Sequence, residues 1–193
     1  MNKFIPMGWN HNPSDWAERV VALVFVLTGF GIAVYLALFQ LGFLASVWDP
    51  IFGEGANRVL HSPLTRKLAV PDAALGALGY LLEAVLIAAG SNKRWRDQPW
   101  IVTLYGIVAA SIGAVSLFLI AYQTVFLRAW CTLCLGSAVI SIGLMIPAAD
   151  EFLATLQFLK RNSSRNEFSW RTFLGLKPEQ APVSHKETNY RRS

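Results

Sequence analysis

The two cysteines of the 193-residue chain, Cys131 and Cys134, are three positions apart in the sequence Trp-Cys-Thr-Leu-Cys. Residues at this spacing face the same side of an α-helix, and one helical turn brings their α-carbons within the reach of a disulfide. The first turn of a helix also has unpaired backbone N–H groups and the positive end of the helix dipole, which favour a thiolate. The run that follows is apolar enough for a membrane helix. We therefore interpret the pair as a dithiol/disulfide switch at a membrane surface.

Two other interpretations of this pair remain open. The cysteines can be small apolar side chains that are simply buried in a membrane helix. They can also belong to a zinc site, which needs about four ligands. Only His61 is expected on the same side of the membrane, so no metal site is predicted unless a dimer shares it.

The composition predicts an integral membrane protein. The chain is 54% hydrophobic and 15% charged, and its apolar residues fall in long runs that a soluble domain of this size does not need. It is too short to add a thioredoxin-like domain to four membrane helices. The net charge of +5 is concentrated in one end and one short loop. We interpret it as a topology signal and expect no nucleic-acid binding.

The apolar runs predict an all-α, four-helix membrane bundle. Its helices are expected at about residues 17–44, 72–89, 99–121 and 130–146. Pro147 is expected to kink or end the last helix. The segment after it, 149–160, is amphipathic and can lie along the interface or extend that helix. A long outer loop, 45–71, is expected to fold as a lid over the helix ends.

The positive charges predict the orientation of this bundle. Lysine and arginine are frequent in the leader, in the loop around 93–96 and in the tail, and sparse in the outer loop. The positive-inside rule therefore puts both termini in the cytoplasm and the two cysteines at the outer face. In a bacterium that face meets the periplasm, where disulfides persist. We expect a multi-pass protein of the inner membrane with a cytoplasmic leader at 1–16, a membrane domain at 17–149 and a basic tail at 150–193.

The order of the motifs resembles a known family. The outer loop ends in Val-Leu-His-Ser-Pro, the second helix opens with Val-Pro-Asp-Ala-Ala-Leu-Gly, and Trp-Cys-Thr-Leu-Cys opens the fourth. The last motif, together with Pro71, Gly76 and Tyr80, is similar to the bacterial members of the vitamin K epoxide reductase family. The resemblance covers roughly residues 17–149.

This resemblance implies a membrane thiol oxidoreductase whose four helices surround a quinone (ubiquinone, menaquinone or a vitamin K form). Cys134 would face the quinone and pass two electrons to it as the disulfide forms. Cys131 would exchange with an incoming thiol, either of a periplasmic thioredoxin-like protein or of a small molecule. The resemblance also places Asp72 and Tyr80 near the quinone, and Ser62 in the loop segment that caps it.

Three residues in or near this implied site have alternative interpretations. A quinone oxygen needs a hydrogen-bond donor, whereas an ionised carboxylate only accepts, so Asp72 can instead cap the second helix after Pro71. Trp130 can stack on the quinone or belong to the aromatic belt at the membrane interface. Glu83, inside the second helix, can exchange the protons of quinone reduction. We favour a structural role for it, as a protonated or hydrogen-bonded glutamate.

The chain departs from the family in its outer loop. Relatives that oxidise protein partners usually carry a second cysteine pair there, as an electron shuttle. The corresponding places fall near Trp48 and Ala56, and this loop has no cysteine. The alternative to an enzyme is therefore a non-catalytic membrane scaffold or redox-sensing subunit. An open approach to Cys131 favours the enzyme, and a sealed Cys131 favours the scaffold.

Overall fold

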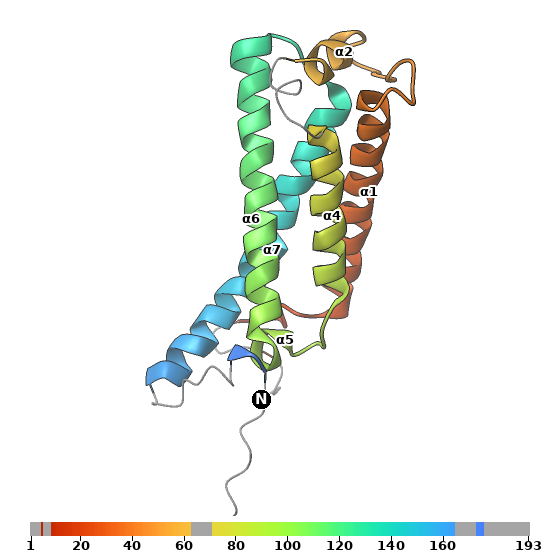
Figure 1. The fold of residues 1–193 in the computed structure, drawn as a ribbon. Helices are drawn as coiled ribbons and strands as arrows, with labels where there is room; N and C mark the ends of the chain where they lie inside the picture. Colours follow the sequence, from red (N-terminus) through yellow and green to blue (C-terminus); the bar gives the residue numbers. More distant parts are fainter. Residues whose placement is uncertain (1–4, 6–8, 63–70, 165–172, 176–193) are drawn as a thin grey trace, which may run out of the picture.

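The computed structural model describes residues 5, 9–62, 71–164 and 173–175, and within these ranges all regular structure is helical. The all-α prediction is confirmed for this part of the chain. The helices are α1 (Trp16–Gln40), α2 (Gly55–Leu60), α4 (Asp72–Ala88), α5 (Arg94–Asp97), α6 (Pro99–Tyr122), the π-helical η1 (Gln123–Leu127) and α7 (Thr132–Ser164) (Figure 1).

Three of these segments are long and apolar enough to cross a membrane. They are Trp16–Gln40, Pro99–Leu127 and Thr132–Arg161. Helix α4 is apolar as well, but it has only 17 residues. The structure therefore supports a membrane protein, and a fourth span at α4 remains a prediction.

The helices α1, α4, α6 and α7 run alongside one another, with α2 near one end and α5 near the other (Figure 1). Helix α1 packs mainly on α4, and α6 mainly on α7. Close contact between α1 and α4 depends on Gly29, because a Cβ there would lie 2.7 Å from Cζ of Tyr80. The buried ring of Tyr80 is thereby fixed between the helices.

Pro147 does not end the last helix, because α7 continues through it to Ser164; a kink at Pro147 remains a prediction. Membrane helices tolerate proline where neighbouring groups hold the chain. Beyond Pro147, the buried Glu151 accepts hydrogen bonds of 2.6 Å from Nε and from Nη2 of Arg94, and one from the hydroxyl of Ser14. Arg94 also donates to the carbonyl of Leu86 at the end of α4. Of the two interpretations of the amphipathic segment, the extended helix is therefore the one observed.

Candidate functional site

The two cysteines form a disulfide at the start of α7, with their α-carbons 5.2 Å apart. Cys131 directly precedes the helix, and Cys134 lies in its first turn. The backbone N–H of Cys134 donates to Sγ of Cys131 over 3.2 Å. The first sulfur thus accepts one of the N–H groups that a helix start leaves unpaired.

The two sulfurs have different surroundings. Cys131 is 0% exposed and packs in a buried cluster with residues of α1, α2 and the turn before α7. Ala56, near one of the places where the resemblance leads us to expect a loop cysteine, belongs to this cluster. Cys134 is half-buried and lines a cavity between the helices. A ligand in the cavity would therefore meet Cys134, while an external thiol has no open path to Cys131.

Residues 41–62, which we term the cap segment, cover Cys131 and are fastened to the start of α7. The carboxylate of Asp49 accepts hydrogen bonds from the backbone N–H (3.2 Å) and the hydroxyl of Thr132. The ring of Phe52 stacks on Trp130 with 6.2 Å between centroids. Gly55 lies so close to Trp130 that a Cβ would be 2.0 Å from the Trp130 carbonyl oxygen.

The pKa of Asp49 reflects this attachment. Desolvation by burial raises it, but hydrogen bonds from the Thr132 hydroxyl and from the backbone N–H groups of Phe52, Thr132 and Ile51 outweigh that effect. The pKa is therefore below the ordinary value of 3.8. The charged carboxylate, not the neutral acid, holds the cap segment on α7.

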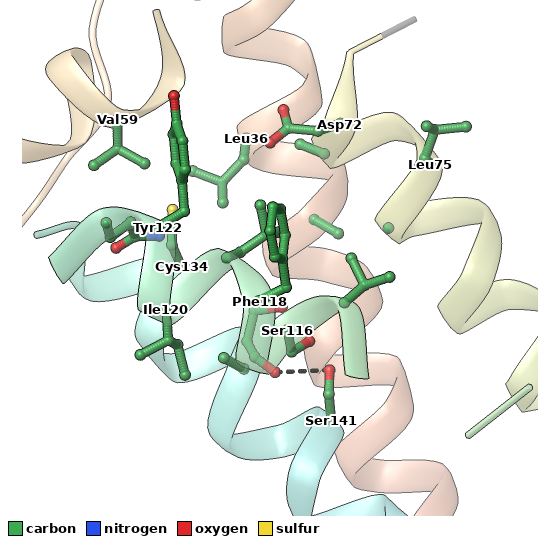
Figure 2. A pocket seen from close by; sticks show the side chains of 18 of the residues that line it. Leu36, Val59, Asp72, Leu75, Ser116, Phe118, Ile120, Tyr122, Cys134 and Ser141 are labelled. Atoms are coloured by element: carbon green, nitrogen blue, oxygen red, sulfur yellow. Dashed lines mark hydrogen bonds between the residues drawn. The ribbon is translucent and has the colours of Figure 1, made fainter. Parts of the chain in front are cut away.

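The cavity has a volume of about 530 Å³, within the usual range for small-molecule sites. Its lining is mostly apolar and comes from α1, the cap segment, α4, α6, η1 and α7 (Figure 2). Figure 2 shows Cys134, Leu36, Val59 and Tyr122 around one part of it and Ser141 in another.

A hydroxyl cluster lies in the wall of the cavity. The hydroxyl of Tyr80 donates to the carbonyl oxygen of Ser137 at 2.7 Å and lies 2.6 Å from Oγ of Ser141. Oγ of Ser137 is 2.9 Å from the same tyrosine oxygen. All three residues line the cavity. Tyr80 and Ser141 both donate to the carbonyl oxygen of Ser137, so the Ser137 hydroxyl is the donor of this cluster that can turn toward a ligand.

The structure brings four of the predicted site residues to the cavity: Cys134, Ser62, Asp72 and Tyr80. Trp130 is not among the lining residues, and its ring contacts Phe52 instead.

The alternative interpretation of Asp72, as the cap of the second helix, is wrong. Its carboxylate accepts a hydrogen bond of 2.5 Å from Nε2 of Gln40, while Oε1 of Gln40 accepts from the backbone N–H of Ala73 at 3.2 Å. Gln40 of α1, and not Asp72, therefore caps α4.

Sequence reasoning missed much of the wall formed by α6, including Ile112, Val115 and Phe118. These are apolar residues in an apolar helix, so no motif distinguishes the cavity face from the lipid face. Tyr122 and Gln123 line the cavity as well; Gln123 is buried, and its Oε1 has no hydrogen-bond partner among the described residues.

Glu83 lies in α4, one turn from Tyr80, and is outside the cavity lining. It is 1% exposed, and neither carboxyl oxygen has a hydrogen-bond partner within the described ranges. We expected a structural glutamate that is either protonated or hydrogen-bonded. The described residues provide no hydrogen bond to its carboxyl group.

Comparison with known proteins agrees with the resemblance noted in the sequence. A search of curated proteins gives no match. The sequence model of the vitamin K epoxide reductase family matches residues 15–149, which include α1, α4, α6 and the cysteine pair at the start of α7. The chain therefore belongs to the vitamin K epoxide reductase family, a group of membrane oxidoreductases that link disulfide chemistry to quinones.

Proposed function

We propose that this protein transfers two electrons from the Cys131–Cys134 dithiol to a membrane quinone. The observation that carries the proposal is the position of Cys134, whose side chain lines an apolar cavity of quinone-compatible size while Cys131 lies behind it. Family membership supports the same chemistry. Ubiquinone, menaquinone and vitamin K forms all fall within this substrate class.

The residues of the cavity fit a quinone ring. Aliphatic walls suit the ring and its tail, and the Ser137 hydroxyl, whose hydrogen can turn away from Tyr80, can donate to a ring oxygen. We assign Ser62, Asp72 and Tyr80 to quinone binding, with Asp72 oriented by Gln40. Trp130 is assigned a positioning role, because it holds Phe52 of the cap segment.

The reaction balances without a further reactant. Two S–H bonds of Cys131 and Cys134 break, one S–S bond forms, and two electrons and two protons convert the quinone to the hydroquinone. The N-terminal end of α7 favours the thiolate at Cys134, and Cys131 lies close enough to close the disulfide. The mostly apolar lining of the cavity limits the water around the reacting sulfur.

The cap segment controls the access of a reducing thiol to the disulfide. A thiol of a periplasmic thioredoxin-like protein, or a small thiol, must reach Cys131, which the cap segment seals. The loop carries no cysteine that could relay electrons. We propose that the cap segment moves away from α7 during this half of the cycle.

The topology that accompanies this function has four spans, with α4 as the short one. An even number of spans leaves both termini on one side, and the distribution of positive charge assigns that side to the cytoplasm. The disulfide then lies at the outer face of the inner membrane, within a membrane domain at 17–149 between a leader (1–16) and a tail (150–193).

A thiol-trapping gel shift tests this proposal. The full chain is reduced in detergent, mixed with a short-tail ubiquinone or menaquinone analogue, and quenched with a maleimide polymer. The proposal predicts that both thiols become unreactive at a rate that follows quinone concentration, and that Cys134→Ser abolishes this dependence. Thiols that stay reactive beside excess quinone would overturn it.

The sealed Cys131 favours a second candidate, a membrane scaffold or redox-sensing subunit that uses the fold without turnover. Its signature is a disulfide that neither a small thiol nor a thioredoxin-like protein can open in the folded, membrane-embedded chain. If either donor reduces the disulfide and quinone oxidises the dithiol again, the scaffold is excluded and the protein acts as an enzyme.

A further inference from the structure

The cavity holds a polar side chain whose hydrogen-bonding capacity the described residues leave partly unused. Gln123 lines the cavity and is 5% exposed. Its backbone N–H is bonded to the carbonyl oxygens of Ile120 and Leu119. Its side-chain Oε1, however, has no hydrogen-bond partner in the described part of the structure. A buried acceptor left unpaired destabilises the fold, and a hydrogen-bond donor on a ligand, such as a hydroquinone hydroxyl, would offset this cost.

The backbone at this position is unusual as well. The α-helix of α6 ends at Tyr122, and the next five residues, from Gln123 to Leu127, form the π-helix η1. A π-helical turn is wider than an α-helical one and changes where side chains point, and such turns are frequent at functional sites. Tyr122, which directly precedes this turn, and Leu127, its last residue, line the same cavity as Cys134. Figure 2 shows Tyr122 and Cys134 in this lining.

We propose that the side-chain amide of Gln123 binds a ring oxygen of the quinone and orients the ring beside Cys134. This inference rests on the proposed function and names a residue that positions its substrate. A quinone oxygen only accepts hydrogen bonds, whereas a hydroquinone hydroxyl also donates. An amide has both N–H donors and a carbonyl acceptor, so Gln123 can bind the substrate before and after its reduction. The carboxylate of Asp72 can only accept when it is ionised.

The test compares Gln123→Met with a matched control, Thr124→Val, in the full reduced chain in lipid nanodiscs. Methionine is close to glutamine in size and removes the amide. Thr124 is the next residue, is exposed, and donates to the carbonyl oxygen of Ile120 in its own helix. The rate of disulfide formation is measured against the concentration of a short-tail ubiquinone analogue. The melting temperature is measured with and without the corresponding hydroquinone.

Gln123→Met should raise KM for the quinone about three- to tenfold, as expected for one lost hydrogen bond, and change kcat less than twofold. It should not lower the melting temperature of the free protein, because the Oε1 atom that it removes has no hydrogen-bond partner in the described part of the structure. It should reduce the stabilisation that hydroquinone gives. Thr124→Val should keep the wild-type KM, and Gln123→Asn should recover part of the loss. A merely structural role for Gln123 predicts a lower melting temperature with no selective change in KM.

The inference fails if Gln123→Met keeps both the wild-type KM and the hydroquinone-induced stabilisation while Cys134→Ser still abolishes the reaction. In that case the proposed function stands and the ring is oriented by other groups. If Gln123→Met does not fold, Gln123→Leu replaces it under the same criteria. If the wild-type dithiol is not oxidised by quinone, the proposed function and this inference fall together.

Discussion

The carboxylate of Asp49 accepts two hydrogen bonds from Thr132, 83 residues further along the chain, one from its backbone N–H and one from its hydroxyl. Thr132 is the first residue of α7 and directly follows Cys131. One loop carboxylate therefore both satisfies the start of the helix that carries the disulfide and holds the segment that covers it.

Removing this carboxylate should expose the disulfide. We expect Asp49→Ala to increase the rate at which dithiothreitol reduces the Cys131–Cys134 bond by about tenfold, because closure of the cap segment loses charge-assisted hydrogen bonds. Glu54→Ala is the control, since Glu54 is exposed in the same segment and, among the described residues, its side chain accepts a hydrogen bond only from Asn57. Equal reduction rates in wild type and Asp49→Ala would mean that Asp49 does not hold the cap.

The same contact makes closure of the cap segment depend on pH. The hydrogen bonds bring the pKa of Asp49 below 3.8, so their stabilisation is complete above that value and is lost as the pH falls through the lowered folded value. Closure should therefore be constant from neutral pH to about pH 5 and weaken below about pH 4. The measurement is the rate of reduction by a phosphine, taken as the ratio of wild type to Asp49→Asn, which cancels the pH dependence of the reagent. That ratio should rise toward 1 only in the acidic range.

A methyl group at Gly55 should also lift the cap segment. The added Cβ would meet the backbone carbonyl of Trp130 at 2.0 Å, which no side-chain rotation can relieve. Gly55→Ala should therefore speed maleimide labelling of Cys131 in a Cys134→Ser background. Gly31→Ala, where the added atom meets nothing within 4 Å, should label like the parent.

The buried pair of Arg94 and Glu151 should dominate stability at the other end of the molecule. Glu151→Gln or Arg94→Met leaves one charged partner buried without its counter-charge, which costs about 3–5 kcal/mol and should lower the melting temperature clearly. Arg94→Met combined with Glu151→Met should recover much of the loss. Arg96→Met is the control, because the Arg96–Asp97 pair is exposed and should contribute little. Dithiol oxidation per folded molecule should be unchanged, since the pair is far along α7 from the cysteines.

Local sequence signals predicted the all-α class and the closeness of the two cysteines, because the length of an apolar run and a one-turn cysteine spacing act within a few residues. The resemblance located Ser62, Asp72 and Tyr80, which do line the cavity. The end of the last helix expected at Pro147 and the capping role considered for Asp72 were wrong for a shared reason: partners distant in sequence determine both. Glu151 is held by Arg94, and α4 is capped by Gln40.

The wall formed by α6 could not be found in the same way. Helix α6 is apolar on all sides, so the sequence around Phe118 looks the same whether this side chain faces lipid or a ligand. Only the packing of α4, α6 and α7 distinguishes the two faces. Gln123 is recognisable in the sequence as a polar residue at the end of an apolar run. Its burial and its unpaired oxygen, however, depend on the π-helical turn.

The most direct test of the central claim is an electron balance under anaerobic conditions. The fully reduced chain in nanodiscs is titrated with a short-tail quinone, and hydroquinone formed is compared with thiols lost from Cys131 and Cys134. The account predicts one hydroquinone per disulfide, and none with Cys134→Ser. Thiol loss without hydroquinone, or hydroquinone that still forms with Cys134→Ser, would contradict it.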